Sequence, residues 1–171
     1  MERAAFLETL GVPDGRIAIG RQFQLLGPTE DTLRAGAEWL KSQGLDLKRM
    51  MKNFPQLLTM SPELLLTKLD FVCTVAGLAK ADIQPVFLAC SLEARMRLRY
   101  FYALQRNVAH RYSFSTLMQR TDADFLQLVS GQPASKTEVA AYKAHVASPE
   151  FRAYMDEEER AIRARGPRVE Q

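Results

Sequence analysis

The chain has 171 residues, of which 47% are hydrophobic and 25% charged, and its formal net charge is +3. This composition is typical of a globular domain, and no apolar run approaches the ~20 residues of a bilayer-spanning helix, so we expect no membrane insertion. The charge is uneven: residues 1–62 hold 8 basic against 7 acidic residues, residues 63–121 hold 8 against 4, and residues 122–171 hold 7 against 9. The basic middle third permits a polyanionic partner without establishing one.

Helix start signals recur along the first hundred residues, whereas strand patterns are nearly absent. Thr29, Ser61 and Ser91 each precede an acidic residue and an apolar run, which is typical of a helix N-cap. Pro62 stands at the first helical position, where its missing N–H costs nothing. These signals predict an all-α chain.

Four further helices are predicted toward the C-terminus. The run FSTLMQ indicates a short helix from about Ser115, and Thr121 precedes another. Ser135 and Glu138 have the spacing of a capping box. A last, highly charged helix is expected to end at Arg165, before a Gly-Pro pair.

Three glycines mark a repeat. Gly11, Gly44 and Gly77 are 33 residues apart, and each is followed by a short helical piece, an apolar pair and one of the capped helices. The apolar pairs are Leu25-Leu26, Leu57-Leu58 and Phe87-Leu88. Three hairpins of similar length could imitate this period, but the matching glycine, proline and cap signals favour a true repeat. Because one unit cannot bury its apolar face, we expect about three stacked units forming a helical solenoid.

The repeat resembles that of a known family. Residues 54–78, FPQLLTMSPELLLTKLDFVCTVAGL, are similar to the repeat of the mitochondrial transcription termination factor (mTERF) family. Residues 87–104, FLACSLEARMRLRYFYAL, resemble the terminal repeats of its plant and algal members. The resemblance covers about residues 10–130. It implies an α-solenoid that binds DNA or RNA along a basic face, in an organelle and without catalysis.

The tail does not match the repeat. We therefore expect an mTERF-like helical-repeat domain over residues 1–130 and a helical extension over residues 131–171. The extension carries an acidic block at residues 156–159. Two interpretations of its last helix stay open: an ordinary solvated terminal helix, or a docking arm for a protein partner.

Signals for catalysis are weak. His110 and His145 have no Cys, Asp or Glu nearby at the spacing of a metal site or a catalytic triad. Cys73 and Cys90 lie inside apolar runs and are expected to be reduced core thiols. No phosphate-binding glycine loop occurs. We predict no catalytic residue, no metal, no cofactor and no small-molecule substrate.

Seven basic side chains are candidates for contacts with nucleic acid: Lys48, Arg49, Lys52, Arg95, Arg99, Arg106 and Arg111. Lys48 and Lys52 are one turn apart on the short helix of the second unit. On a regular α-helix, Arg95, Arg99 and Arg106 share one face, whereas Arg97 points elsewhere.

Aromatic residues lie among these arginines. Tyr100, Phe101 and Tyr102 follow Arg99 directly, and arginine beside aromatic rings suits RNA through phosphate contacts and base stacking. In the alternative interpretation, the rings form core and the arginines form the solvated face of an amphipathic helix.

The resemblance and the basic groups together predict a non-enzymatic RNA-binding accessory component of an organellar ribonucleoprotein. We place it in the mitochondrial ribosome, with the chloroplast as the alternative compartment. Its partners would be organellar rRNA and neighbouring proteins, with DNA left open. Two alternatives remain: a purely structural, protein-binding subunit of an organellar membrane or multiprotein complex, and a free regulator of organellar transcription or RNA processing.

Overall fold

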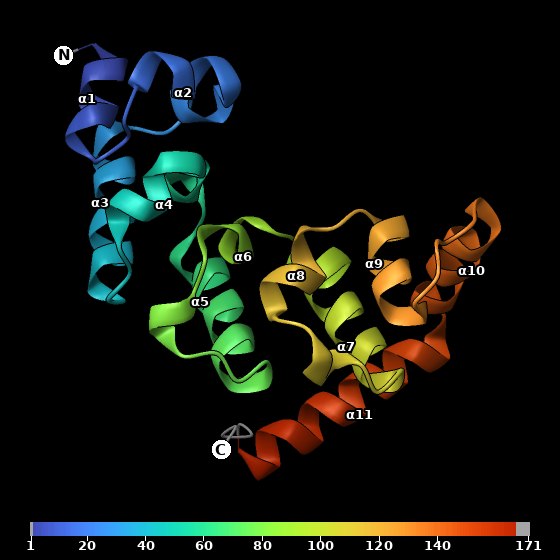
Figure 1. Cartoon of the computed structure of the whole chain (residues 1–171). Coiled ribbons are helices and arrows are strands. Elements are labelled where there is room, and N and C mark those ends of the chain that lie inside the picture. The colour runs from blue at the N-terminus through green and yellow to red at the C-terminus, as the bar shows by residue number, and fades with distance from the viewer. Residues whose placement is uncertain (1, 167–171) are drawn as a thin grey trace. The chain divides into compact units, whose positions relative to one another are not determined.

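The computed structural model describes residues 2–166 (Figure 1). Over these residues the chain forms eleven α-helices, six short 3-10 or π segments and no strand, which confirms the all-α prediction. Within the same range, no helix has both the length and the apolar character needed to span a membrane. The helices form two compact units, which we describe separately. The first contains residues up to 72 together with 78–89, and the second contains 73–77 and the residues from 90 onwards.

The first unit contains the first six helices. Its elements are α1 (Arg3–Thr9), α2 (Gly15–Arg21), η1 (Phe23–Leu26), α3 (Glu30–Ser42), α4 (Leu47–Asn53), η2 (Pro55–Thr59), α5 (Pro62–Asp70), η4 (Lys80–Asp82) and α6 (Pro85–Ala89). The π segment η3 (Phe71–Val75) follows α5 directly, and its residues are divided between the two units.

The second unit contains the remaining five helices. Its elements are η5 (Leu92–Arg97), α7 (Leu98–Gln105), η6 (Ala109–Arg111), α8 (Phe114–Gln119), α9 (Asp122–Ser130), α10 (Lys136–Ala147) and α11 (Pro149–Arg165). The predicted capping box is present, because Ser135 and Glu138 bind each other's backbone N–H groups. Helix α11 ends at Arg165 as predicted.

The three glycines of the repeat each end a helix, at a joint where the chain turns into the next helix. Gly11, Gly44 and Gly77 all have a left-handed backbone, with φ of 91°, 76° and 75°. After Gly11, the N–H of Val12 donates to the carbonyl of Leu7 (3.2 Å), which closes the helix end in the manner of a Schellman motif. The glycines are required because a Cβ is unfavourable at positive φ.

The structure adds a fourth joint at Asn107. Its φ is 56°, and the N–H of the next residue, Val108, donates to Ala103 O (2.9 Å). Asparagine tolerates this backbone better than most residues, although glycine is the usual signal. The segment that follows repeats the pattern with η6, α8 and the capped helix α9. Sequence reasoning overlooked this joint because it searched for glycine.

The predicted caps are present. Thr29, Ser61 and Ser91 each accept the backbone N–H of the residue three positions later. Thr121 caps α9 in the same way, and the helix expected from about Ser115 begins at Phe114, capped by Ser113.

Two of the three predicted apolar pairs form seams between successive repeats, whereas in the first pair Leu25 is buried but Leu26 is 50% exposed. Leu57 and Leu58 are buried, as are Phe87 and Leu88. The fourth repeat has its own pair, Leu117-Met118, again with both side chains buried, and the three pairs start 30 residues apart. In each case, a residue from the longer helix of the preceding repeat reaches the backbone carbonyls of the pair.

The residue at each seam differs from repeat to repeat. Gly36 of α3 packs so closely on Leu58 that a Cβ added there would lie 2.8 Å from its carbonyl oxygen. Lys68 of α5, which is buried, donates from Nζ to Leu88 O (2.6 Å). Arg99 of α7 donates to the carbonyls of Leu117 (3.0 Å) and Met118 (3.4 Å). Close contact or a cation therefore meets the carbonyls at all three seams.

A π turn shifts the third repeat by one residue. Gly36 and Lys68 stand seven residues after their caps, but Arg99 stands eight after Ser91. Segment η5 supplies the extra residue, because the N–H of Met96 donates five positions back to Ser91 O (3.0 Å). Residues before and after this turn do not share faces as they would on a straight α-helix.

Replacing Gly36 with Ala tests the seam. The added methyl group meets the backbone of Leu58, which cannot swing aside as a side chain can, so we expect a loss of about 1–3 kcal/mol in the free energy of unfolding. Urea denaturation measures it. The control is Gly20→Ala in α2, where nothing lies within 4 Å, and it should gain about 0.5–1 kcal/mol from helix propensity. Equal effects of the two substitutions would contradict the packing at the seam.

Candidate nucleic-acid interface

Helix α4 presents the basic cluster of the first unit. Lys48, Arg49 and Lys52 are exposed, while Leu47, Met50 and Met51 point inward and are buried. Asp46 caps the helix by accepting the N–H of Arg49 (3.1 Å) through its carboxylate. Among the described residues, no carboxylate lies within ion-pair distance of the three cations. The cluster is therefore free to meet an anion.

Three arginines of the second unit are also exposed. Arg95 lies in η5, Arg106 follows the end of α7, and Arg111 ends η6. Within residues 2–166 none of them forms an ion pair. The guanidinium of Arg106 lies over the ring of Tyr102, 5.2 Å from its centroid, which orients the group while leaving it solvent-accessible.

Arg99 does not belong to this surface, and its predicted role is corrected. Its side chain is 2% exposed. In addition to the seam carbonyls, it donates to Arg120 O (2.7 Å) and Asp122 Oδ1 (2.7 Å), and it lies over the ring of Phe125. It therefore holds the C-terminal carbonyls of α8 and the start of α9 together. The predicted face failed because the π turn in η5 rotates Arg99 relative to Arg95.

Asp122, the carboxylate that binds Arg99, has a lowered pKa. Partial burial of Asp122 favours the neutral carboxyl, but the guanidinium of Arg99 and the ammonium of Lys143 outweigh it and hold the pKa of Asp122 below its ordinary value. Asp122 therefore stays ionised at neutral pH, and Arg99 keeps a charged acceptor.

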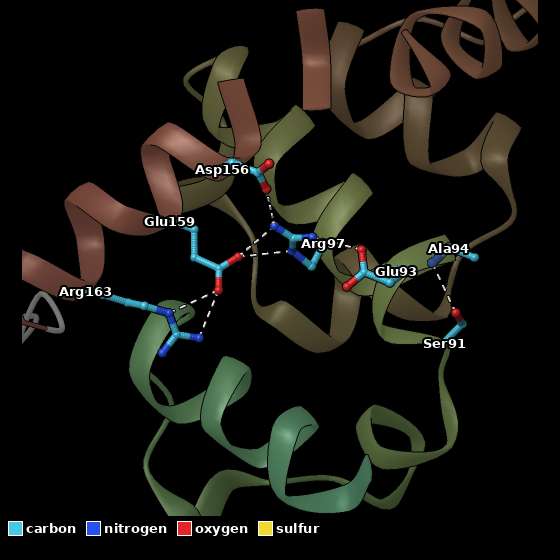
Figure 2. A network of polar contacts seen from close by, with 7 residues as sticks. All are labelled: Ser91, Glu93, Ala94, Arg97, Asp156, Glu159 and Arg163. Carbon is cyan, nitrogen blue, oxygen red and sulfur yellow. Dashed lines mark hydrogen bonds and ion pairs between the residues drawn. The ribbon is translucent and has the colours of Figure 1, made fainter. Parts of the chain in front are cut away.

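Arg97 lies at the centre of a second ion network, shown in Figure 2. It donates from Nη1 to Glu93 Oε2 (2.8 Å) within its own segment. It also donates to two carboxylates of α11, from Nη2 to Asp156 Oδ1 (2.9 Å) and from Nε to Glu159 Oε2 (3.0 Å). Arg163 then holds Glu159 from the next turn of α11 (2.9 Å).

This network docks the C-terminal helix. The side chains of Arg97 and Glu159 are each 17% exposed. Burial disfavours the charged guanidinium, but the surrounding carboxylates prevail and raise the pKa of Arg97 above its ordinary value. Phe151 and Met155 of α11 are buried as well. Half of the acidic block is thus used within the chain, which sequence reasoning missed because Arg97 and α11 are about sixty residues apart.

The aromatic residues near the arginines are mainly core. Phe101 and Tyr102 are buried, and Tyr100 donates its hydroxyl to Val75 O (3.0 Å). His145 contacts Gln105 Oε1 through Nε2 (2.9 Å) and lies edge-on to Tyr102. Cys73 and Cys90 are partly buried and belong to no disulfide. No group of three His, Cys, Asp or Glu side chains in residues 2–166 is placed to hold a metal ion.

The repeated helices and their seams agree with a comparison against family models. The mTERF model matches residues 2–126, well over half of the chain. The chain belongs to the mTERF family. No curated protein and no solved structure matches it.

Membership confirms the resemblance and the helical-repeat fold. Proteins of the mTERF family bind nucleic acids, act in organellar gene expression and are generally not enzymes. The match ends within α9, so α10 and α11 lie beyond it, although they belong to the same compact unit as α7. The domain boundary expected at residue 130 stays a prediction.

The docking of α11 can be tested at Arg97. In Arg97→Gln, Asp156 and Glu159 lose the cation that joins them to η5, and among the described residues Glu159 keeps only Arg163 of its own helix. We therefore expect α11 to open more readily, by roughly 1–2 kcal/mol given that Asp156 remains solvent-screened. Hydrogen exchange of the α11 amides measures this opening. Arg95→Gln removes the same charge from the same segment without touching α11, and should leave exchange unchanged. Equal protection of α11 in both variants would contradict the network.

Proposed function

We propose that this protein binds RNA as a non-enzymatic accessory component of an organellar ribonucleoprotein, and that this particle is the mitochondrial ribosome. The observation that carries the proposal is that most of the candidate basic side chains are exposed and unpaired within the described part of the chain. Six of the seven predicted cations are exposed and lack an ion-pair partner among the described residues, although carboxylates elsewhere in the chain hold Arg97 and Arg99.

The chemistry of the second unit supports RNA as the ligand. The three candidate cations that stay exposed there, Arg95, Arg106 and Arg111, are all arginines, whose planar guanidinium binds phosphate through two parallel hydrogen bonds and stacks on exposed bases. The first unit adds Lys48, Arg49 and Lys52, of which the lysines suit phosphate as point charges. On either unit, contacts of this kind provide positioning without reading sequence, as expected of a component that binds a fixed site in a particle.

The C-terminal extension supports an accessory role. Its last helix is fixed to the second unit through Arg97 and buried apolar residues, and it still presents Glu157 to solvent. A docked helix of this kind offers a surface to neighbouring proteins without occupying the free arginines. The absence of catalysis, the choice of RNA over DNA and the mitochondrial location are parts of the proposal.

Sedimentation of organelle extracts tests the proposal. The tagged protein should co-sediment with a mitochondrial ribosomal subunit, and RNase or high salt should release it, because phosphate contacts weaken steeply with salt. The variant Arg95→Gln, Arg106→Gln, Arg111→Gln should be released at lower salt. Arg99 is left unchanged because its substitution would disturb the fold.

The matched control is Lys41→Gln, Lys80→Gln, Lys136→Gln, which removes the same charge from exposed positions outside both clusters. It should sediment like the wild type. Association that survives both RNase and salt would replace RNA binding with a purely protein-facing structural role. Sedimentation with a chloroplast particle would place the protein in the chloroplast instead. A protein that sediments with no particle but binds DNA or RNA would indicate a free regulator of transcription or RNA processing.

A further inference from the structure

A cavity of about 440 Å³ opens in the second unit among α7, α9 and α10. Its volume is within the range of small-molecule sites, roughly 300–1,000 Å³. Four lining residues, Glu138, Ala141, Tyr142 and His145, come from one face of α10 at helical spacing. Tyr102 of α7 and Arg106, which follows the last residue of α7, line it from the other side. The α10 wall lies beyond the residues that match the mTERF family.

Aromatic rings form one side of the cavity. Tyr142 meets the ring of Tyr102 edge-on at 4.9 Å between centroids, and His145 meets the same ring at 5.8 Å. The guanidinium of Arg106 covers the face of Tyr102. Guanidinium planes and aromatic rings are the groups on which proteins stack nucleobases. Ala141 lies between Glu138 and His145 and, having only a methyl side chain, leaves the middle of the wall open.

Opposite charges line the two walls. Glu138 on α10 accepts the N–H of Ser135 through Oε2 (2.7 Å), a hydrogen bond that lowers the pKa of this carboxyl. It is therefore an ionised, acceptor-only group with its other oxygen available. Arg106 on α7 is a donor-only group without an ion-pair partner among the described residues.

We propose that this cavity binds a nucleoside monophosphate unit with an amino-bearing base. The base would stack on the partly exposed ring of His145 and donate its amino hydrogens to Glu138, while Arg106 holds the phosphate. Uracil fits least well, because carbonyl groups flank its only N–H and would face the carboxylate. The unit comes either from a free nucleotide or from an unstacked nucleotide of RNA. The second source rests on the proposed function, and the first does not.

Titration of the full chain with AMP, CMP, GMP, UMP and adenosine, followed by calorimetry, tests the site. The three amino-bearing nucleotides should bind about tenfold more tightly than UMP, as expected when a hydrogen bond to a charged group is lost. Adenosine should bind more weakly than AMP. Equal affinity for all four nucleotides, or no binding of any, would overturn the proposal.

Three variants separate the parts of the site. Glu138→Gln preserves the capping box, since glutamine serves in that motif, and should abolish the preference over UMP. Arg106→Gln should reduce AMP to the affinity of adenosine. Ala141→Leu fills the cavity without changing any charge and should abolish binding. Its control is Ala140→Leu, an exposed neighbour that does not line the cavity and should bind normally.

The two sources and the two proposals are distinguishable. If Ala141→Leu removes a preference for RNA oligonucleotides with amino-bearing bases over oligouridine, the bound nucleotide belongs to RNA. If it changes only mononucleotide binding, the ligand is free nucleotide. If the wild type binds AMP but does not associate with RNA, the proposed function is wrong and the cavity proposal stands. If the Ala141→Leu variant is folded by circular dichroism, associates normally with the ribosome and still binds AMP as the wild type does, the cavity proposal is wrong and the proposed function stands.

Discussion

The seam carbonyls are the constraint on which the repeats depend. Each of these repeats ends a short helix at an apolar pair, and the last carbonyls of a helix have no partner further along it. Buried carbonyls left unpaired would destabilise the fold by about 1–3 kcal/mol each. Lys68 and Arg99 donate to these carbonyls from the preceding long helix, while at the first seam α3 comes so close that only glycine fits at position 36. Two of the buried charges are thus explained by backbone chemistry rather than by a ligand.

The seams and the docking of α11 also decide which arginines stay exposed to solvent. Arg99 holds α8 and α9, and Arg97 holds α11, so neither is available to phosphate. Arg95, Arg106 and Arg111 lie at the edges of the same segments and stay exposed. A stretch of sequence that looks uniformly basic therefore contains two classes of arginine. Because the mTERF family binds nucleic acids, the exposed arginines are the ones that we propose for contacts with RNA.

The sequence predicted what depends on local backbone chemistry. Cap residues such as Ser61 and joint glycines such as Gly44 act within a few residues, so their signals were sufficient. Three features required more. Asn107 forms a joint without the usual glycine, the π turn in η5 moves Arg99 inward, and Arg97 meets partners about sixty residues away. Local patterns were thus enough to name the exposed cations that form the candidate site, whereas separating them from the buried Arg99 required three-dimensional packing.

Arginine side-chain NMR during a titration with RNA tests the division between these two classes most directly. Each guanidinium reports its own environment through its Nε–Hε signal, and assignment by single Arg→Lys substitutions identifies it. The account predicts that the signals of Arg95, Arg106 and Arg111 shift as RNA is added, while those of Arg97 and Arg99 stay in place. Shifts of Arg97 or Arg99 at the same RNA concentration, or unmoved signals from the exposed three, would contradict it.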